Sequence, residues 1–250
     1  MITEDNYENV RVLKIVGVNK YNPFSFALNK EIREAMVRAS NDDSVRAIIL
    51  TSGIGSSLSV GADFNELKNF NTEEEVNYWV DEVVKIYTTI LDIEKPTIVA
   101  FDGYAIGMGF QLSMLFDYRI MSSRSEFRMP EIQHGLACTM GSAILEYLIG
   151  HNVMRDIVFG GNAIDPEFAL RTNLVNKVVE PEELLNTSLE VANKLAGYPI
   201  TSFSVTKSVV VKGLINKINA VTDETKRAHI KCFMSKSGHE HFQRILKQKY

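Results

Sequence analysis

Hydrophobic and polar positions in the first fifty residues follow the periods of strands and helices. Val10–Val16 carries apolar residues on a partly alternating pattern, which is typical of a part-exposed strand. Leu28–Ser40 places its apolar residues on one face of a helix, and Arg46–Thr51 is a run typical of a buried strand. This order of strand, loop, helix and strand predicts an α/β domain with right-handed crossovers.

The middle of the chain continues the alternation. Thr72–Ile93 is expected to be a long amphipathic helix with acidic residues at its start, and Trp79 and Tyr87 lie on its apolar stripe. A lone Trp on such a stripe belongs to a core more often than to a ligand site. Thr97–Phe101 predicts a buried strand, Gly107–Phe116 a helix and Tyr118–Met121 another strand.

The last hundred residues become increasingly helical, and the last strand-type signal lies at Val209–Val211. The expected elements before it are a helix at Gly141–Leu148, a turn into a short helix at Ile164–Leu170 with Asp165 as its N-cap, a strand at Leu174–Val179 and a helix at Glu182–Ala196. We expect a core domain over residues 1–200 and a helical C-terminal region over residues 201–250.

Composition is that of an ordinary soluble globular protein: the chain has 250 residues, of which 45% are hydrophobic and 23% charged. The formal net charge of −4 argues against a nucleic-acid-binding protein. Cys138 and Cys232 are too few for a disulfide framework and fit a reducing cytoplasm. No apolar run approaches about twenty residues, and the acidic N-terminus is unlike a signal peptide. We therefore expect a cytoplasmic protein with no membrane segment.

The glycine-rich stretch DGYAIGMGFQ, residues Asp102–Gln111, is the first candidate for chemistry. A strand that ends in glycines and opens a helix leaves unpaired backbone N–H groups, which attract a negative oxygen. This predicts an anion or oxyanion site near Met108. A dinucleotide fingerprint fits less well, because Leu112 stands where its third glycine is required. A tight turn without any ligand explains the glycines equally well.

The loop MPEIQHG contains the second candidate, Glu131. Its carboxylate is either solvated or held in an apolar cleft, where a raised pKa would make it a base; the general exposure of Glu favours the solvated alternative. His134 lies four residues before Cys138, but without a third orienting group we expect a buried structural cysteine. His239 and His241 are two residues apart, which is poor spacing for a metal site, so we expect surface histidines and no metal.

Three segments resemble the crotonase (enoyl-CoA hydratase/isomerase) family: SVGADFNEL at Ser59–Leu67, KPTIVAFDGYAIGMGFQL at Lys95–Leu112 and MPEIQHGL at Met129–Leu136. The resemblance covers essentially the whole chain. It implies an α/β fold of repeated ββα units with a helical C-terminal trimerisation region, a coenzyme A thioester as substrate, and a homotrimer or dimer of trimers. In that family two backbone N–H groups hold the thioester oxygen. The matching motifs assign this role to Ala62 and Met108, and they place Gly61 and Gly107 beside the substrate.

Two positions depart from the pattern of the family's hydratases. Those enzymes use two glutamates, whereas the corresponding positions here are Gln111 and Glu131. An amide cannot exchange a proton at neutral pH, so paired acid–base addition of water is in doubt. Met108 replaces a glycine and adds bulk beside the thioester carbon.

The same motifs, with NKYNPFS and the closing KQKY, are most similar to family members that form carboxymethylproline for carbapenem antibiotics. This resemblance implies that malonyl-CoA loses CO2, that the enolate attacks 1-pyrroline-5-carboxylate, and that Glu131 activates water to hydrolyse the thioester, without metal or redox cofactor. It also places Trp79 and His229 around the imine. The alternatives are a core Trp79 and a solvated His229. Two alternative functions remain for the protein as a whole. It could be another crotonase that decarboxylates, hydrolyses or hydrates an acyl-CoA, or a non-catalytic relative.

Overall fold

The computed structural model describes residues 1–17, 19–235, 240–242 and 244. Six strands form the main sheet in the order β1-β2-β3-β4-β6-β8. Neighbouring strands are parallel, except that β1 runs antiparallel to β2. The strands are β1 Ile2–Tyr7, β2 Val10–Ile15, β3 Ala47–Thr51, β4 Thr97–Phe101, β6 Tyr118–Ser122 and β8 Lys177–Val179.

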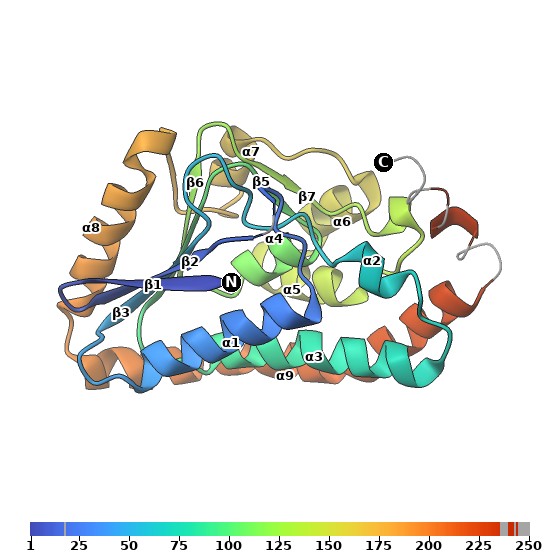
Figure 1. Ribbon diagram of the computed structural model, residues 1–250, viewed down its shortest axis with the longest axis horizontal. Coiled ribbons are helices and arrows are strands. Elements are labelled where there is room, and N and C mark those ends of the chain that lie inside the picture. The colour runs from blue at the N-terminus through green and yellow to red at the C-terminus, as the bar shows by residue number, and fades with distance from the viewer. Residues whose placement is uncertain (18, 236–239, 243, 245–250) are drawn as a thin grey trace.

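Helices cover both faces of this sheet, which explains why every residue of β3 and β4 is buried. Alternate residues of β4 point to opposite faces: Ile98 packs toward helix α8, and Val99 toward the larger core on the other side. Figure 1 shows α8 alone on one side of the sheet and the other long helices on the opposite side. The helices are α1 Phe26–Asn41, α2 Phe64–Leu67, α3 Glu73–Leu91, α4 Met108–Ser113, α5 Thr139–Ile149, α6 His151–Gly160, α7 Pro166–Arg171, α8 Leu184–Ala196 and α9 Ile200–Met234, with short 3-10 turns at Ile132–His134 and Pro181–Glu183.

A second, two-stranded sheet stands beside the first and carries the glycine-rich turn. Its strands, β5 Tyr104–Ile106 and β7 Glu126–Arg128, are parallel, and each follows a strand of the main sheet after a tight turn. An isolated bridge from Ser59 to Ala105 adds the loop that precedes α2. These repeated units of two strands and a helix were the fold expected from the family resemblance.

Several elements differ from the sequence-based expectation. Strand β1, the pair β5 and β7, and helix α6 were not predicted. The three-residue strands β5 and β7 are too brief to establish a period, and β1 is largely exposed, so it has no buried side that would give an apolar alternation. Val209–Val211 was expected to be the last strand signal, but it lies inside α9. There Val209 and Val210 are 72% and 66% exposed, so β-branched composition alone was misleading.

Helix α9 runs along α3 and α5, and α3 also contacts α1 (Figure 1). Near its start the buried Lys207 places Nζ 2.6 Å from the Asp117 carboxylate and 3.1 Å from the carbonyl oxygen of Lys95. Burial lowers the pKa of Lys207, and Asp117 opposes that effect. The ion pair fixes the helix beneath the sheet, and the remaining turns extend toward the pocket described below.

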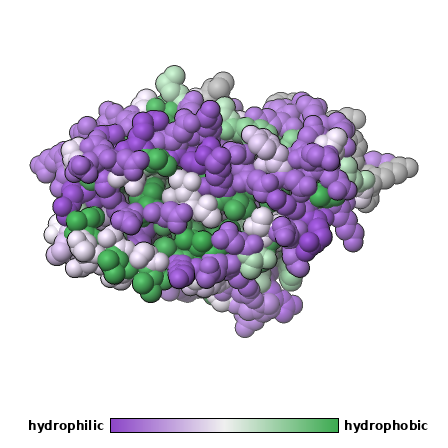
Figure 2. Space-filling model, turned by 90° about the horizontal axis from the view of Figure 1, so that it is seen from below, coloured by the Kyte–Doolittle hydropathy of each residue, from purple (hydrophilic) through white to green (hydrophobic). Residues whose placement is uncertain are grey.

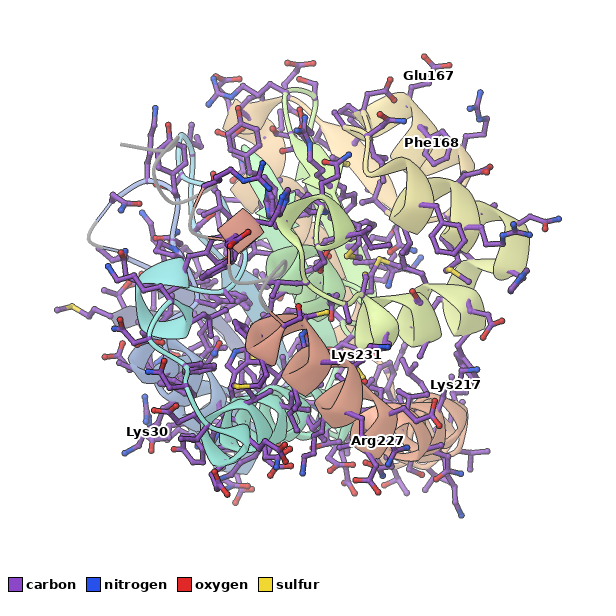
Figure 3. All side chains as sticks on the ribbon, turned by 90° about the vertical axis from the view of Figure 1, so that its right-hand side faces the viewer. Lys30, Glu167, Phe168, Lys217, Arg227 and Lys231 are labelled. Carbon is purple, nitrogen blue, oxygen red and sulfur yellow. The ribbon has the colours of Figure 1, made fainter. Side chains whose placement is uncertain are left out.

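The surface of α9 differs from its buried stripe. Thr225, His229 and Phe233 are spaced by four residues and point inward, whereas Arg227 and Lys231 between them are exposed. Figure 3 shows Lys217, Arg227 and Lys231 along this helix. Figure 2, a view from below, shows apolar side chains gathered between hydrophilic margins. None of the described helices is long and apolar enough to cross a lipid bilayer.

Candidate active site

Two backbone loops meet where the glycine-rich turn enters α4. Ile106 N donates to Ser59 O at 2.9 Å, and Phe24 N donates to Gly61 O at 2.8 Å. The first bond holds the loop around Ala62 against the strand that leads to Met108, and the second joins the same loop to the segment before α1. The amide of Met108 is the first of its helix and has no acceptor within that helix. In the described part of the chain, neither the Ala62 nor the Met108 amide donates to another backbone or side-chain group.

Gly61 and Gly107 make this approach possible. Gly61 has a φ of +98°, and a Cβ atom there would lie 3.2 Å from Ile106 O and 3.8 Å from Met108 N. Gly107 has a φ of +54°, and its Cβ atom would lie 3.3 Å from Oε1 of Glu131. Both backbone conformations favour glycine. The two amides and the Glu131 carboxylate therefore lie around one small space.

Glu131 is not the solvated residue that exposure statistics favoured. Its Oε2 atom is buried and has no hydrogen-bond partner in the described structure, while Oε1 accepts from Nε2 of Gln111 at 2.8 Å. Burial raises the pKa of Glu131 to about 7, and hydrogen bonding by a backbone N–H and by the Gln111 amide partly opposes this. In the 3-10 turn that follows, the apolar Ile132 is 48% exposed, whereas the carboxylate of Glu131 points inward. The apolar residue and the charged residue have therefore exchanged the positions expected from their polarity.

The hydrogen-bond chain extends beyond Gln111 to a residue that the sequence analysis assigned to an apolar stripe. The hydroxyl of Tyr87, on α3, donates to Oε1 of Gln111 at 3.1 Å. Tyr87 is fully buried. A tyrosine on a buried helical stripe needs a polar partner, and that requirement was the available signal for this contact. The Gln111 amide on α4 therefore links α3 to the loop that carries Glu131.

Aromatic side chains form a wall of the same space. The rings of Trp79 and His229 meet edge to face, with centroids 4.9 Å apart, and Phe233 lies behind them. Trp79 is half-buried; it packs against the core and also lines the pocket. His229 is buried, so the solvated alternative is wrong. Its Nδ1 atom has no partner in the described structure, and burial lowers its pKa to about 4.

These features enclose a pocket of about 710 Å³, counting its open mouth. Its titratable lining groups in the described chain are Tyr87, Glu131, His134, Cys138 and His229, and the lining contains no Lys or Arg. Cys138 is buried as expected, and burial together with the charge of Glu131 holds its pKa well above the usual range.

Of the predicted histidine pair, only His241 lies in the described part of the chain, and it is not among the residues that line this pocket. A ring nitrogen of His241 is 2.6 Å from Gln133 O, whereas His239 and the closing KQKY lie outside the described residues. Gln111, Glu131 and the Ala62 and Met108 residues are brought together, and Trp79 and His229 line the same pocket.

The model of the enoyl-CoA hydratase/isomerase family matches residues 5–249. The chain belongs to this family. A carboxymethylproline synthase from Pectobacterium carotovorum is 40% identical over 250 residues, which is the full length of both chains. A short-chain-enoyl-CoA hydratase from Clostridium acetobutylicum is 34% identical over 82% of this chain and 78% of its own.

Solved structures agree with the crotonase fold. ThnE from S. clavuligerus has a TM-score of 0.81 and 30% sequence identity, covering 91% of this chain and all of its own. Human mitochondrial delta3-delta2-enoyl-CoA isomerase has a TM-score of 0.88 over 99% of this chain and 97% of its own, at 22% identity, which supports the fold alone. The family and fold expected from the three motifs are confirmed, as is the similarity to the carboxymethylproline-forming branch.

Proposed function

We propose that this crotonase is a carboxymethylproline synthase of carbapenem biosynthesis, using malonyl-CoA and 1-pyrroline-5-carboxylate. The observation that carries the proposal is the pairing of one buried carboxylate, Glu131, with a neutral Gln111 2.8 Å away, beside two unpaired amides. The 40% identity to a carboxymethylproline synthase over both full chains supports the same reaction.

The first step is decarboxylation. The thioester oxygen of malonyl-CoA accepts hydrogen bonds from the Ala62 and Met108 amides. The C–C bond to the carboxylate breaks, CO2 leaves, and its electron pair forms an enolate on that oxygen. Donors placed where charge develops are worth about 2.7–4 kcal/mol each. The apolar lining also favours loss of a carboxylate, because it offers no Lys or Arg to stabilise the starting anion.

The second step forms the new C–C bond. The enolate carbon attacks the imine carbon of 1-pyrroline-5-carboxylate in its protonated form, and the C=N electrons pass to the ring nitrogen. This requires the imine carbon to be held about 3–3.5 Å from the enolate carbon in a space that excludes water. The wall of Trp79 and His229 is suited to that role because its packed rings line the same pocket as Ala62 and Met108.

The third step hydrolyses the thioester. Glu131 accepts a proton from water, and the resulting hydroxide attacks the thioester carbon. The oxyanion that forms is held on the same two amides. When the C–S bond breaks, Glu131 returns its proton to the departing sulfur, which gives free carboxymethylproline and coenzyme A. The reaction requires no metal or redox cofactor.

Gln111 suits this single-base mechanism better than a second glutamate would. A neutral amide donates a hydrogen bond to the ionised form of Glu131, which favours it, whereas a neighbouring carboxylate would raise the pKa of Glu131 further. The base therefore remains available near neutral pH.

Mass spectrometry of the products tests the proposal. Malonyl-CoA together with 1-pyrroline-5-carboxylate should give carboxymethylproline, coenzyme A and CO2, and treatment with a chelator should leave the rate unchanged. Malonyl-CoA alone should give mainly acetyl-CoA. Acetyl-CoA or free acetate as the sole product under both conditions would identify a decarboxylase or hydrolase, and hydration of crotonyl-CoA would identify a hydratase. No turnover of any acyl-CoA would support a non-catalytic relative.

A further inference from the structure

We propose that Tyr87 is a positioning residue: its hydroxyl orients the Gln111 amide so that the NH2 group, rather than the C=O group, faces Glu131. The role rests on the proposed hydrolytic function of Glu131, but its structural part can be tested without substrate. Tyr87 lies on α3, Gln111 on α4, and Glu131 before the 3-10 turn at Ile132–His134. The three side chains form one line of hydrogen bonds.

The donors and acceptors of this line are determined from its Tyr87 end. The Tyr87 side chain is fully buried, and burial and the charge of Glu131 raise the pKa of its hydroxyl well above the usual value, so it keeps its proton. That O–H donates to Oε1 of Gln111 at 3.1 Å. The other end of the amide then presents Nε2, which donates to Oε1 of Glu131 at 2.8 Å and contacts Sδ of Met129 at 3.8 Å.

The opposite orientation of the Gln111 amide favours the protonated form of Glu131, which cannot act as a base. With Oε1 of Gln111 facing it, an ionised carboxylate would meet another acceptor, so Glu131 would hold its proton and donate it. The amide NH2 would then face the Tyr87 oxygen, and the Tyr87 proton would lose its acceptor in a buried place. Leaving a buried donor unpaired costs free energy. Tyr87 therefore disfavours the arrangement in which Glu131 is protonated.

Other titratable groups around Glu131 do not replace this effect. Cys138 lines the same pocket and, with its pKa well above the usual range, is a neutral thiol. His229, on α9, is neutral above a pKa of about 4. His134 lines the same pocket from the 3-10 turn. Among these lining groups, Gln111 is the one that links Glu131 to the Tyr87 hydroxyl, so removal of that hydroxyl should act through Gln111.

The test is an infrared titration of the Glu131 carboxyl group in Tyr87→Phe, with the spectrum of Glu131→Gln subtracted to isolate its signal. We expect the midpoint of the titration to rise by roughly half a unit to one unit, as loss of one buried neutral hydrogen bond predicts. Tyr78→Phe is the matched control, because Tyr78 lies on the same helix and is 58% exposed. In this variant the midpoint of the Glu131 titration should stay at the wild-type value. Thermal unfolding of the same samples checks the fold.

A double-mutant comparison separates positioning from a general effect of the cavity. In a Gln111→Leu background, Tyr87→Phe should produce no further rise, because the amide through which it acts is gone. An unchanged midpoint in Tyr87→Phe alone, or an equal rise in both backgrounds, would overturn the proposal.

The pH profile of thioester hydrolysis links the same residue to turnover. In Tyr87→Phe the acidic limb should move by the amount seen in the infrared titration, with kcat lowered below that midpoint and KM unchanged. A shifted infrared midpoint in a protein that makes no carboxymethylproline would leave the positioning role intact and overturn the proposed function. Normal formation of carboxymethylproline with an unshifted infrared midpoint would overturn the positioning role of Tyr87 and leave the proposed function intact.

Discussion

Replacement of Glu131 by Gln should make the folded protein more stable, and the gain should grow with pH. The side chain keeps its size and can still meet Gln111, but it no longer carries a charge into a buried position. Burial raises the pKa of Glu131 from 4.5 to about 7. The folded protein therefore holds this proton more tightly than the unfolded chain does.

The sign and size of the effect follow from linkage. Below the unfolded value of 4.5 both states are protonated, and the carboxyl costs nothing. Between that value and a pKa of about 7 the unfolded chain loses its proton first, so stability falls as pH rises. Above the folded pKa the cost is complete and amounts to about 3 kcal/mol, since each unit of pKa corresponds to about 1.4 kcal/mol.

Urea unfolding of wild type and Glu131→Gln at about pH 5 and about pH 8.5 measures this cost. The difference in unfolding free energy between the two proteins should widen by about 2–3 kcal/mol toward the higher pH. Glu190→Gln is the matched control, because Glu190 is exposed on α8 and its replacement removes the same charge away from the pocket. A gap for Glu131→Gln that stays constant with pH would refute the account of a desolvated carboxylate.

Three further predictions concern the reaction and the assembly. Glu131→Ala should nearly abolish free carboxymethylproline, while Gln111→Ala should weaken turnover without ending it; near-native product release from Glu131→Ala, measured by mass spectrometry, would exclude it as the hydrolytic base. Trp79→Ala should raise the ratio of acetyl-CoA to carboxymethylproline, because an enolate without a nearby electrophile is protonated, and an unchanged ratio in the folded variant would assign Trp79 to the core alone. Light scattering at micromolar concentration should show a homotrimer or a dimer of trimers, and a monomeric wild type would contradict this prediction. Val209→Glu, at a 72% exposed apolar position of α9, should weaken the assembly if that face is in the interface.

Local patterns were sufficient to predict the long elements. Helix α3 begins where it was expected because Thr72 and Glu75 form a capping box, in which each side chain accepts from the other residue's backbone N–H. The strand at Thr97–Phe101 and the N-cap at Asp165 were also confirmed. In each case neighbours in sequence supply the interactions that define the element.

The burial and hydrogen bonding of the site residues depend on contacts between segments that are distant in sequence. Local sequence patterns do not predict such contacts. The Oε2 atom of Glu131 is buried although the residue as a whole is half-buried, and His229 is buried because α9 packs along α3. Tyr87 was predicted to be apolar core, and its hydroxyl finds Gln111 only after α3 and α4 pack together. The motif match located the two unpaired amides, but their proximity arises from the bridge between Ser59 and Ala105.

The route of α9 also sets the order in which the pocket can be assembled on the ribosome. The loops around Ala62 and Met108 and the carboxylate of Glu131 are synthesised well before His229, the histidine of the aromatic wall. At about 5–20 residues per second, the nascent chain spends roughly 5–20 seconds between those two points. During that interval the chain contains Trp79 but not His229, so the aromatic wall is incomplete. A chain that ended before Thr225 would lack His229 permanently, and with it that part of the pocket lining.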